Sequence, residues 1–400
     1  MPAKSPDIVV IGAGAFGGWT ALHLLNRGAR VTLVDAWGAG HLRGTSSGET
    51  RVIRCGYGLK PVYTAWAWRA LKLWKRWQRK WATEFFVNSG VLWLCAEEDA
   101  YVRASFAALR RLRIPHERLS TAELARRYPQ MNFEGIRFGY LEPRAGFLRA
   151  RAATMRVAEA VAQHPRGRAL IAAAEPPDSK LENRSRSLGT RLGKIRTHNG
   201  ATLRADAFVF ACGPWLPQLF PALLGRRIRV TQQDVHFFGP PPGDRRFESG
   251  AMPVWIEPAS DYYCVPAFDS RGVKIACDAP GPIFDPTTGE RIADSAGAEA
   301  ARRHLARRLP AMRAAPLVET RVCQYERTPD SHLVMDRHPE YENVWLVGGG
   351  SGHGFKLGPA VGEFVAEQLL ARRPKPLPPE MRLGASAWPD SGPLPITHSF

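Results

Sequence analysis

The stretch Asp7-Ile8-Val9-Val10-Ile11-Gly12-Ala13-Gly14-Ala15-Phe16-Gly17 decides the fold of this chain. Its first half, residues 7–11, is an almost wholly apolar run, which is typical of a strand buried on both faces. Residues 19–25 repeat apolar side chains with helical periodicity, and residues 30–35 form a second apolar run. The sequence therefore predicts a strand, a Gly-rich turn, a helix and a second strand, the βαβ unit of a dinucleotide-binding fold.

Three glycines give this turn its ligand-binding pattern. Gly12 permits the tight turn, Gly14 lets the backbone approach a pyrophosphate, and Gly17 allows the helix to pack closely on the strand. The pyrophosphate is expected at the N-terminus of the helix, where free N–H groups favour an anion. Asp35 ends the second strand and is expected to accept a hydrogen bond from a ribose hydroxyl, which disfavours a 2′-phosphate there. The motif alone does not distinguish NAD from FAD.

A second glycine-rich turn near the other end of the chain favours FAD. Residues 343–347 form another apolar run, and residues 348–356, Gly-Gly-Gly-Ser-Gly-His-Gly-Phe-Lys, lead into a helical pattern from Pro359. A turn so far from the first in sequence could close over the far end of a large cofactor, which fits a flavin. A helix N-terminus aimed at the flavin pyrimidine would stabilise the negative charge of the reduced ring.

Length and composition exclude several classes of protein. The 400 residues suggest two or three domains, and 44% hydrophobic with 23% charged residues is ordinary globular composition, not that of a disordered or fibrous chain. Six cysteines are too few for a disulfide scaffold. No apolar run reaches the ~20 residues that cross a bilayer, and the glycine-broken N-terminal run is no secretory signal. We therefore expect a reduced, cytoplasmic protein without membrane contact.

The charge balance is strongly basic, with Lys+Arg 55 against Asp+Glu 37 and a net charge of +18. Such an excess of positive charge could indicate binding to nucleic acid or to a membrane. It is equally typical of a protein from a generally basic proteome or of one that binds anionic small substrates. The basic residues are scattered, which favours the second interpretation. The densest cluster, in residues 72–81, interleaves with tryptophans at helical spacing and predicts an amphipathic helix. The histidines show no ligand spacing, so no metal site is predicted.

The dinucleotide-type strands occur at the start, in the middle and near the end of the chain, with other material between them. We therefore predict an α/β, Rossmann-like FAD-binding domain interleaved with an α+β, mixed-sheet substrate and catalytic domain. The predicted FAD-binding domain takes residues 1–58, 140–215 and 318–372, the substrate domain takes 59–139 and 216–317, and the Pro-rich residues 373–400 form a surface tail.

Three groups of motifs carry a resemblance to a known family. They are Gly48-Glu49-Thr50-Arg51-Val52-Ile53-Arg54; Gly272-Val273-Lys274; and Cys323-x-Tyr325-x-x-Thr328-Pro329-Asp330-x-His332, followed by His338-Pro339 and by residues 351–356. Up to about residue 372 the chain resembles the monomeric sarcosine oxidase and N-methyltryptophan oxidase group, within the D-amino-acid-oxidase-like FAD superfamily. The third group is the most specific, because several residues match at fixed spacing.

The resemblance implies a covalently bound cofactor. The cysteine that matches Cys323 carries FAD through an 8α thioether, and such a bond would raise the flavin potential. Arg51 resembles the flavin-proximal arginine of the group, and His353 matches a flavin-contacting histidine. The remaining expected cofactor contacts lie in the second glycine-rich turn: Gly350, Gly352, Gly354 and Lys356.

The resemblance also assigns catalytic roles. Arg54 and Lys356 would clamp a substrate carboxylate, the guanidinium by two parallel hydrogen bonds and the ammonium as a point charge. Lys274 would lie against the flavin and assist electron transfer to O₂ by stabilising developing negative charge. Tyr263 and Tyr325 match pocket tyrosines, although half-buried strand aromatics explain them equally well.

The sequence departs from the sarcosine-type pattern at three places. Asp278 stands where those enzymes have a histidine, and it could pair with a cationic or N–H-bearing substrate or act as a base. Some related enzymes that oxidise cyclic imino acids also have an acid there. Trp255 stands in place of a smaller methionine and would narrow the pocket or stack on an aromatic ring, and Ser46-Ser47 replace histidines. These changes point away from sarcosine itself.

Together these observations predict an FAD-dependent oxidase of secondary or N-alkyl, including cyclic, amino acids. Hydrogen would pass from carbon to flavin N5, the imine would leave, and O₂ would reoxidise the flavin to give H₂O₂. The partners expected are an amino-acid-like small molecule and O₂, with the protein a monomer or weak oligomer and nucleic acid disfavoured. Two alternatives stay open: a dehydrogenase that passes electrons to a carrier, and a tRNA-modifying flavoprotein that uses the +18 charge.

Overall fold

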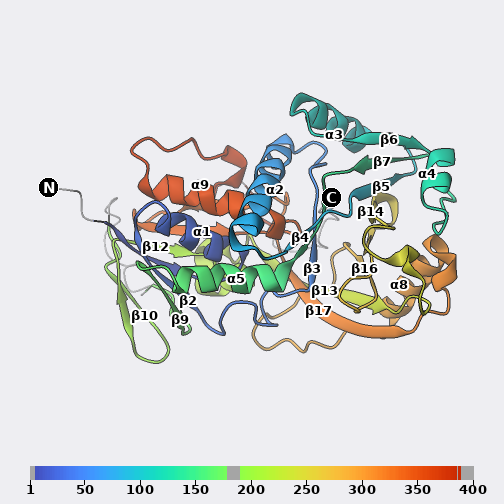
Figure 1. The fold of residues 1–400 in the computed structure, drawn as a ribbon. Helices are drawn as coiled ribbons and strands as arrows, with labels where there is room; N and C mark the ends of the chain where they lie inside the picture. Colours follow the sequence, from blue (N-terminus) through green and yellow to red (C-terminus); the bar gives the residue numbers. More distant parts are fainter. Residues whose placement is uncertain (1–4, 178–189, 385, 389–400) are drawn as a thin grey trace.

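The computed structural model describes residues 5–177, 190–384 and 386–388, and it places two sheets side by side (Figure 1). The first sheet has six strands in the order β18 (Val334–Arg337), β19 (Val344–Gly348), β12 (Ala207–Phe210), β1 (Asp7–Ile11), β2 (Arg30–Asp35) and β9 (Gly167–Ile171). All neighbours run parallel except β18, which is antiparallel to β19. This is the predicted doubly wound sheet, and it is assembled from both ends and the middle of the chain.

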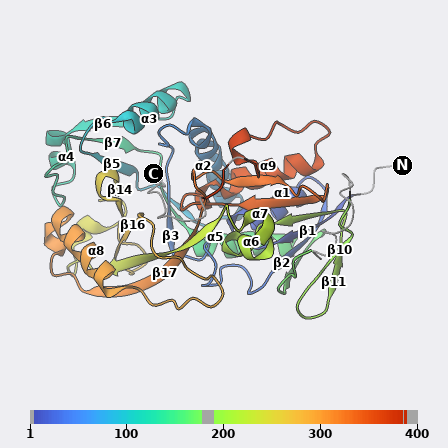
Figure 2. The ribbon, with the colours of Figure 1, turned by 180° about the vertical axis from the view of Figure 1, so that it is seen from behind.

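Both faces of the six-stranded sheet are covered, as its apolar strands require. Helices α1 (Ala15–Leu25), α5 (Ala150–Ala162) and α9 (Gly358–Leu370) lie over one face, where Val10 packs. The other face, where Val9 packs, carries the two short helices α6 (Leu216–Leu219) and α7 (Pro221–Leu224) and the hairpin β10 (Lys194–Arg196) and β11 (Thr202–Arg204), as Figure 2 shows. Successive residues of β1 therefore enter different cores.

Helix α2 (Pro61–Trp81) confirms the predicted amphipathic helix. Trp74 and Trp77 are buried, and their rings lie 5.1 and 5.8 Å from that of Trp19 in α1. The opposite face carries exposed basic side chains, among them Arg76 and Lys80. The basic cluster is thus the solvated face of a packed helix.

The second sheet has eight strands and is mixed. Its order is β17 (Leu317–Arg327), β13 (Arg229–Phe238), β16 (Val273–Cys277), β15 (Tyr262–Val265), β14 (Val254–Glu257), β5 (Val91–Cys95), β7 (Phe138–Glu142) and β6 (Glu117–Ser120). Neighbours are antiparallel except β14 and β5. Helix α8 (Ser295–Arg308) packs on this sheet, and α3 (Ala100–Arg111) and α4 (Thr121–Arg127) lie at its far end (Figure 1).

A three-stranded sheet of β3 (Thr50–Ile53), β8 (Gly146–Arg149) and β4 (Phe86–Val87) lies between the two larger sheets. Strand β3 carries Arg51, and Arg54 follows directly after the strand. The motif therefore sits where the two larger units meet.

Several details differ from the sequence prediction. Residues 318–327, assigned to the FAD-binding domain, are hydrogen-bonded in β17 to β13 of the eight-stranded sheet. The polar, alternating sequences of β13 and β17 gave no continuous apolar run, so their full length was not predicted. The expected tail is partly packed: Met381 and Trp388 are buried, whereas residues 389–400 lie outside the described residues. The division into domains stays a prediction.

A membrane-spanning helix and a cluster of metal-binding side chains are both absent from the described residues. No helix in them is both long and apolar enough to cross a membrane. Nor do the same ranges bring together three or more His, Cys, Asp or Glu side chains that could hold a metal ion.

Candidate functional site: a dinucleotide cavity and a cationic pocket

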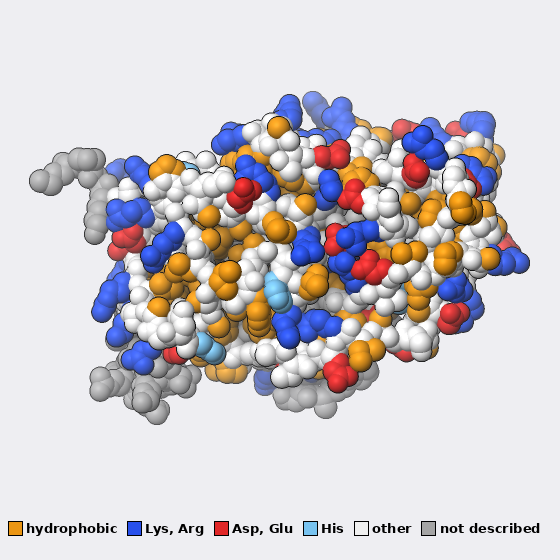
Figure 3. Space-filling model, turned by 60° about the horizontal axis from the view of Figure 1, so that its bottom comes forward, with side chains coloured by type: hydrophobic (Ala, Val, Ile, Leu, Met, Phe, Trp, Pro, Cys, Tyr) orange, Lys and Arg blue, Asp and Glu red, His pale blue; other side chains and the backbone are white. Residues whose placement is uncertain are grey.

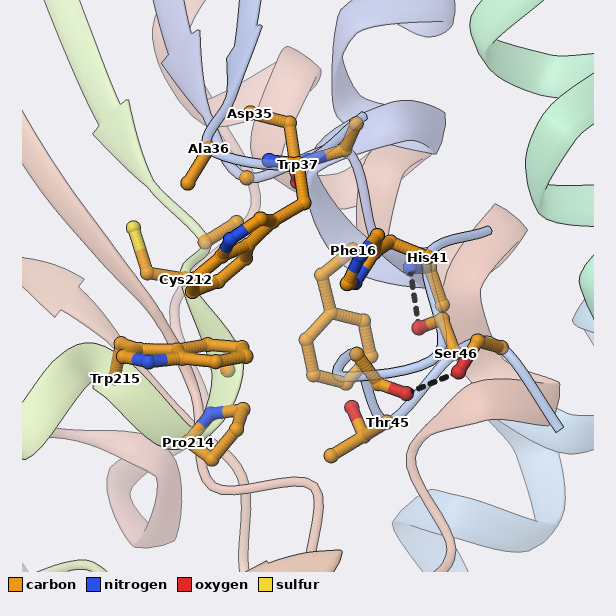
Figure 4. A pocket seen from close by; sticks show the side chains of 18 of the residues that line it. Phe16, Asp35, Ala36, Trp37, His41, Thr45, Ser46, Cys212, Pro214 and Trp215 are labelled. Atoms are coloured by element: carbon orange, nitrogen blue, oxygen red, sulfur yellow. Dashed lines mark hydrogen bonds between the residues drawn. The ribbon is translucent and has the colours of Figure 1, made fainter. Parts of the chain in front are cut away.

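A cavity of about 480 Å³ opens at the C-terminal ends of the strands of the six-stranded sheet. There β1 lies between β12 and β2, so connections leave in opposite directions, which is where such sheets bind ligands. The cavity is lined by the turn after β1, the segment after β2, the turn after β12 and the turn after β19 (Figure 4). The predicted residues Gly12, Gly14, Asp35, Arg51, Gly350, Gly352 and Gly354 all line it.

The first turn requires its glycines. Gly12 has φ +97, and a Cβ there would lie 2.2 Å from the Ala211 carbonyl oxygen. A Cβ on Gly17 would lie 1.8 Å from the Gly12 carbonyl oxygen, so only glycine lets α1 pack this closely on the turn. Gly14 is the N-cap of α1 and provides no capping side chain. The α1 N-terminus therefore faces the cavity with backbone groups suited to a pyrophosphate.

Asp35 is held in place by the backbone. Its Oδ2 accepts a hydrogen bond from Ala13 N at 2.8 Å, and its Oδ1 accepts one from Trp37 N at 3.0 Å. Each carboxylate oxygen keeps acceptor capacity toward the cavity. The position suits the ribose contact that the sequence predicts.

Aromatic rings form one end of the cavity, and the sequence analysis gave them no role. The centroids of Trp37 and Trp215 are 4.8 Å apart, and His41 stacks on Trp37 at 5.7 Å (Figure 4). Such rings offer flat faces to an aromatic base. The available signals were Trp37, two residues after the acid, and Trp215, which closes the turn after β12.

A second, smaller pocket lies beside the first and collects most of the predicted catalytic residues. Its walls come from the three-stranded sheet, from the eight-stranded sheet and from the turn that follows β19 of the six-stranded sheet. The residues are Arg51, Val52, Arg54, Ile256, Tyr263, Asp278, Tyr325, Gly352, His353, Phe355 and Lys356. Residues more than 300 positions apart in the sequence thus meet in one pocket, here called the cationic pocket.

Arg54 and Lys356 are both buried in the cationic pocket, and both contact Tyr57. The Arg54 guanidinium lies 4.3 Å from the Tyr57 ring centroid and 5.0 Å from that of Trp93, and its Nη1 donates to the Gly56 carbonyl oxygen. Lys356 Nζ donates to the Tyr57 hydroxyl at 3.3 Å. Burial and the nearby Arg54 lower the pKa of Lys356 well below its usual range. Two basic groups are therefore held close together with little water around them, and a bound anion would favour the charged form of the lysine.

His353 is a neutral hydrogen-bonding link in this pocket. Its Nε2 lies 2.9 Å from the Ser331 carbonyl oxygen, which only accepts, so Nε2 carries the proton. Its Nδ1 then accepts from the Tyr57 hydroxyl at 3.5 Å. Burial and the charge of Lys356 lower the pKa of His353 well below its usual range.

Arg51, Cys323 and Lys274 form a cluster around the Thr50 carbonyl oxygen. Arg51 Nη1 donates to this oxygen at 2.9 Å and Lys274 Nζ donates to it at 3.2 Å. Arg51 Nη2 also donates to Cys323 Sγ at 3.1 Å. Burial and the positive charge of Arg51 lower the pKa of Lys274 to about 7. The lysine and the cysteine named from sequence thus both lie close to Arg51, which lines the cationic pocket, although neither of them lines that pocket itself.

The two tyrosines and the acid complete the pocket. Tyr263 and Tyr325 lie on β15 and β17, and burial raises the pKa of each hydroxyl. Asp278 follows β16 and is buried, with its backbone oxygen accepting from Arg327 Nη2 at 2.6 Å. All three line the pocket, which favours the pocket role of the tyrosines over that of ordinary strand aromatics.

The prediction that Trp255 narrows or stacks in this pocket is wrong. Side chains alternate along β14, and it is Ile256 that lines the pocket. Trp255 points to the opposite face, where it is buried in a separate core, with its ring 6.0 Å from that of His304. Both residues are apolar, so their side-chain types do not indicate which one faces the ligand.

The residues present fit FAD. The glycine turn, Asp35 and the aromatic end suit the nucleotide part, and the cavity continues to Gly350 and Gly354 beside the cationic pocket. Glu326 also lines the cavity, is buried, and its Oε2 has no partner among the described residues. An orphaned carboxyl oxygen in a cavity wall needs a donor, and the hydroxyl-rich chain of FAD provides such groups. The sequence analysis missed Glu326.

A dinucleotide cavity at the switch point of a parallel sheet, joined to a buried cationic pocket, defines a dinucleotide-dependent oxidoreductase. The chain belongs to the FAD dependent oxidoreductase family, which it matches over residues 7–368. The cofactor is therefore FAD.

Relatives and solved structures extend along nearly the whole chain. It is 29% identical over 371 residues to the monomeric sarcosine oxidase of Streptomyces avermitilis, covering 91% of this chain and 93% of that one. It is 27% identical over 376 residues to the N-methyl-L-tryptophan oxidase of Salmonella arizonae, covering 92% and 95%. The crystal structure of L-proline dehydrogenase from P. horikoshii matches with a TM-score of 0.78 at 22% identity, covering 94% and 96%. This last likeness is one of fold.

Proposed function

We propose that this protein oxidises secondary or N-alkyl amino acids, including cyclic ones, to imines. The observation that carries the proposal is the pair of buried basic groups, Arg54 and Lys356, which both contact Tyr57 in a pocket beside the cofactor cavity. Buried basic groups that line a pocket favour an anionic ligand. The sarcosine and N-methyl-L-tryptophan oxidases among the relatives act on such carboxylates by name.

The chain's own residues bind and orient the substrate. Arg54 and Lys356 hold the carboxylate, which fixes the neighbouring carbon in one orientation. Asp278 lines the same pocket and can accept a hydrogen bond from the substrate N–H. Neutral His353 keeps the Tyr57 hydroxyl oriented between the two cations. When bound, FAD supplies the acceptor for the hydrogen removed from the substrate carbon.

Lys274 is proposed to assist the reaction with O₂. Its ammonium is buried beside Arg51 and donates to the Thr50 carbonyl oxygen. A fixed positive charge in a dry site lowers the energy of negative charge that develops on oxygen. Peroxide is then the expected second product.

Cys323 is proposed to carry the cofactor covalently. Its sulfur accepts a hydrogen bond from Arg51 Nη2 at 3.1 Å, and Arg51 lines both the cofactor cavity and the cationic pocket. The six cysteines are free thiols, which suits the reducing cytoplasm in which we propose that the protein acts.

The experiment is anaerobic mixing of the purified yellow protein with a panel of N-methyl and cyclic secondary amino acids. Bleaching of the flavin absorbance by members of the panel supports the proposal, and failure of every member removes this substrate class. Air is then admitted, and peroxide yield is compared with reduction of an added dye. Peroxide supports an oxidase, whereas dye reduction without peroxide indicates a dehydrogenase.

Covalent attachment has its own measurement. After acid denaturation and precipitation, flavin fluorescence is expected to stay with the protein. The Cys323→Ala variant is expected to release its flavin into the supernatant, with Cys277→Ala, another partly exposed thiol, as the control. Retention of flavin by Cys323→Ala would assign the linkage elsewhere.

A further inference from the structure

Glu142, at the end of β7, is a buried acid that accepts three hydrogen bonds. Its side chain is almost inaccessible, with the residue 1% exposed. Cys55 N donates to Oε2 at 2.6 Å, Gly56 N donates to Oε1 at 3.0 Å, and Trp93 Nε1 donates to Oε1 at 3.0 Å. A carboxylate accepts from all three donors at once, which few other side chains can do.

The groups held by Glu142 are those that hold Arg54. Gly56, whose N–H donates to Glu142, also provides the carbonyl oxygen that accepts from Arg54 Nη1. Trp93, whose indole N–H donates to Glu142, lies with its ring 5.0 Å from the Arg54 guanidinium. Cys55 N is the next amide after Arg54 itself. One carboxylate therefore fixes both the loop and the ring that confine the guanidinium.

The hydrogen bonds of Glu142 position Arg54 and so favour binding of a carboxylate, whereas its negative charge repels that carboxylate. It favours the charged forms of Arg54 and Lys356, raising the pKa of each against the effect of burial. At the same time a nearby negative charge weakens the attraction of the pocket for another carboxylate. The two roles thus predict opposite outcomes when the charge is removed.

We propose that Glu142 is a positioning residue that fixes Arg54 for the substrate carboxylate. The inference rests on the proposed function, because it takes Arg54 to be a carboxylate-binding group. Glu142 does not line the cationic pocket, and it positions Arg54 through Cys55, Gly56 and Trp93.

The test is the Glu142→Gln variant of the flavin-loaded protein, measured by calorimetric titration with pyrrole-2-carboxylate and with its uncharged twin pyrrole-2-carboxamide. If the glutamine oxygen keeps the bonds from Gly56 N and Trp93 Nε1, its amide nitrogen faces Cys55 N. If the amide is turned over, the nitrogen faces the other two donors. The anchor for three donors is therefore lost in either orientation. The Kd for the carboxylate is expected to rise about 10-fold or more, since hydrogen bonds to charged groups are the strong ones. The Kd for the carboxamide is expected to stay unchanged.

Glu257→Gln is the matched control. Glu257 is equally a buried acid of the eight-stranded sheet, but it bonds Arg308 and His304 on the side of β14 away from the pocket. This variant is expected to leave both Kd values unchanged. Trp93→Phe removes the indole donor and keeps an aromatic ring beside Arg54. It is expected to raise the carboxylate Kd about 3-fold, which gives a second measurement in case Glu142→Gln does not fold.

The remaining outcomes are distinct. Tighter carboxylate binding by Glu142→Gln would overturn the proposal, since it would make Glu142 a counter-charge only. Unchanged carboxylate binding by both Glu142→Gln and Trp93→Phe would overturn it in favour of a purely structural role. A wild-type protein that does not prefer the carboxylate over the carboxamide would instead refute the carboxylate clamp of the proposed function.

Discussion

Lys274 is the residue whose protonation we expect to be visible in the kinetics. Its ammonium is buried, and burial together with Arg51 lowers its pKa to about 7. The charged form predominates below that pH, and it is this form that stabilises negative charge on oxygen. In stopped-flow mixing of the reduced protein with O₂, the reoxidation rate is therefore expected to fall as the pH rises through about 7.

The Lys274→Met variant separates this effect from other titrations. It keeps the length of the side chain and removes the charge, so reoxidation is expected to slow about 100-fold and lose its pH dependence. Anaerobic reduction by substrate is expected to change much less. An unchanged pH profile in the variant would show that another group titrates.

At the scale of elements, strand β14 separates the ligand pocket from a structural core. Ile256 lines the pocket, while Trp255 lies in the core against α8. Ile256→Ala enlarges the pocket and is expected to shift the preference toward bulkier amino acids, by about 10-fold in the ratio of kcat/KM values. Trp255→Phe is expected to leave that ratio unchanged and to lower the free energy of unfolding. A changed ratio in Trp255→Phe would mean that the wrong face of β14 was assigned.

The same strand ends in a buried ion pair. Glu257 accepts from Arg308 Nε at 2.8 Å and from His304 Nε2 at 2.9 Å, and β14 and α8 are thereby joined. Burial opposes ionisation of Glu257, but the hydrogen bonds from Arg308 and His304 lower its pKa from 4.5 to about 2. Because the pKa of Glu257 is lower in the folded protein, its ionised form stabilises the fold at pH values above the ordinary pKa of 4.5. This stabilisation is lost as the pH falls from 4.5 toward 2.

Glu257→Gln is therefore expected to lower the free energy of unfolding by ~3 kcal/mol at neutral pH, because it leaves Arg308 buried without its partner. Denaturant titrations of both proteins give this difference, and it should shrink as the pH is lowered toward 3. A difference that stays constant with pH would mean that the ionisation of Glu257 does not contribute.

At the scale of the whole molecule, the elements that could be predicted from the sequence are those formed by residues close together in the chain. The βαβ unit at 7–35 and the helix with Trp74 were predictable, because apolar periodicity and glycine spacing lie within short windows. The long strands β13 and β17 were not, since their polar residues are buried only through contacts with distant segments. Glu142 gave a faint signal, an acid ending an apolar strand. Its partners Gly56 and Trp93 are remote in sequence, so its role could be read only from the fold.

The net charge of +18 is the remaining feature of the whole molecule. On the face shown in Figure 3, Lys and Arg side chains are interspersed with acidic and apolar ones. A nucleic-acid surface would instead gather its basic groups along one stripe or face. The structure of this face gives no support to the tRNA-modifying alternative.

RNA binding is therefore expected to be weak and non-specific. A protein that contacts several phosphates loses affinity steeply with salt, about one power of the salt concentration for each phosphate neutralised. We expect RNA to leave this protein already at ~0.2 M salt, and added tRNA to leave kcat/KM for an N-methyl amino acid unchanged. The measurements are the 260/280 nm absorbance ratio across a salt gradient and turnover with and without tRNA. RNA that stayed bound at about 0.5 M salt would contradict this prediction, because it would mean that the scattered basic side chains form an RNA-binding site.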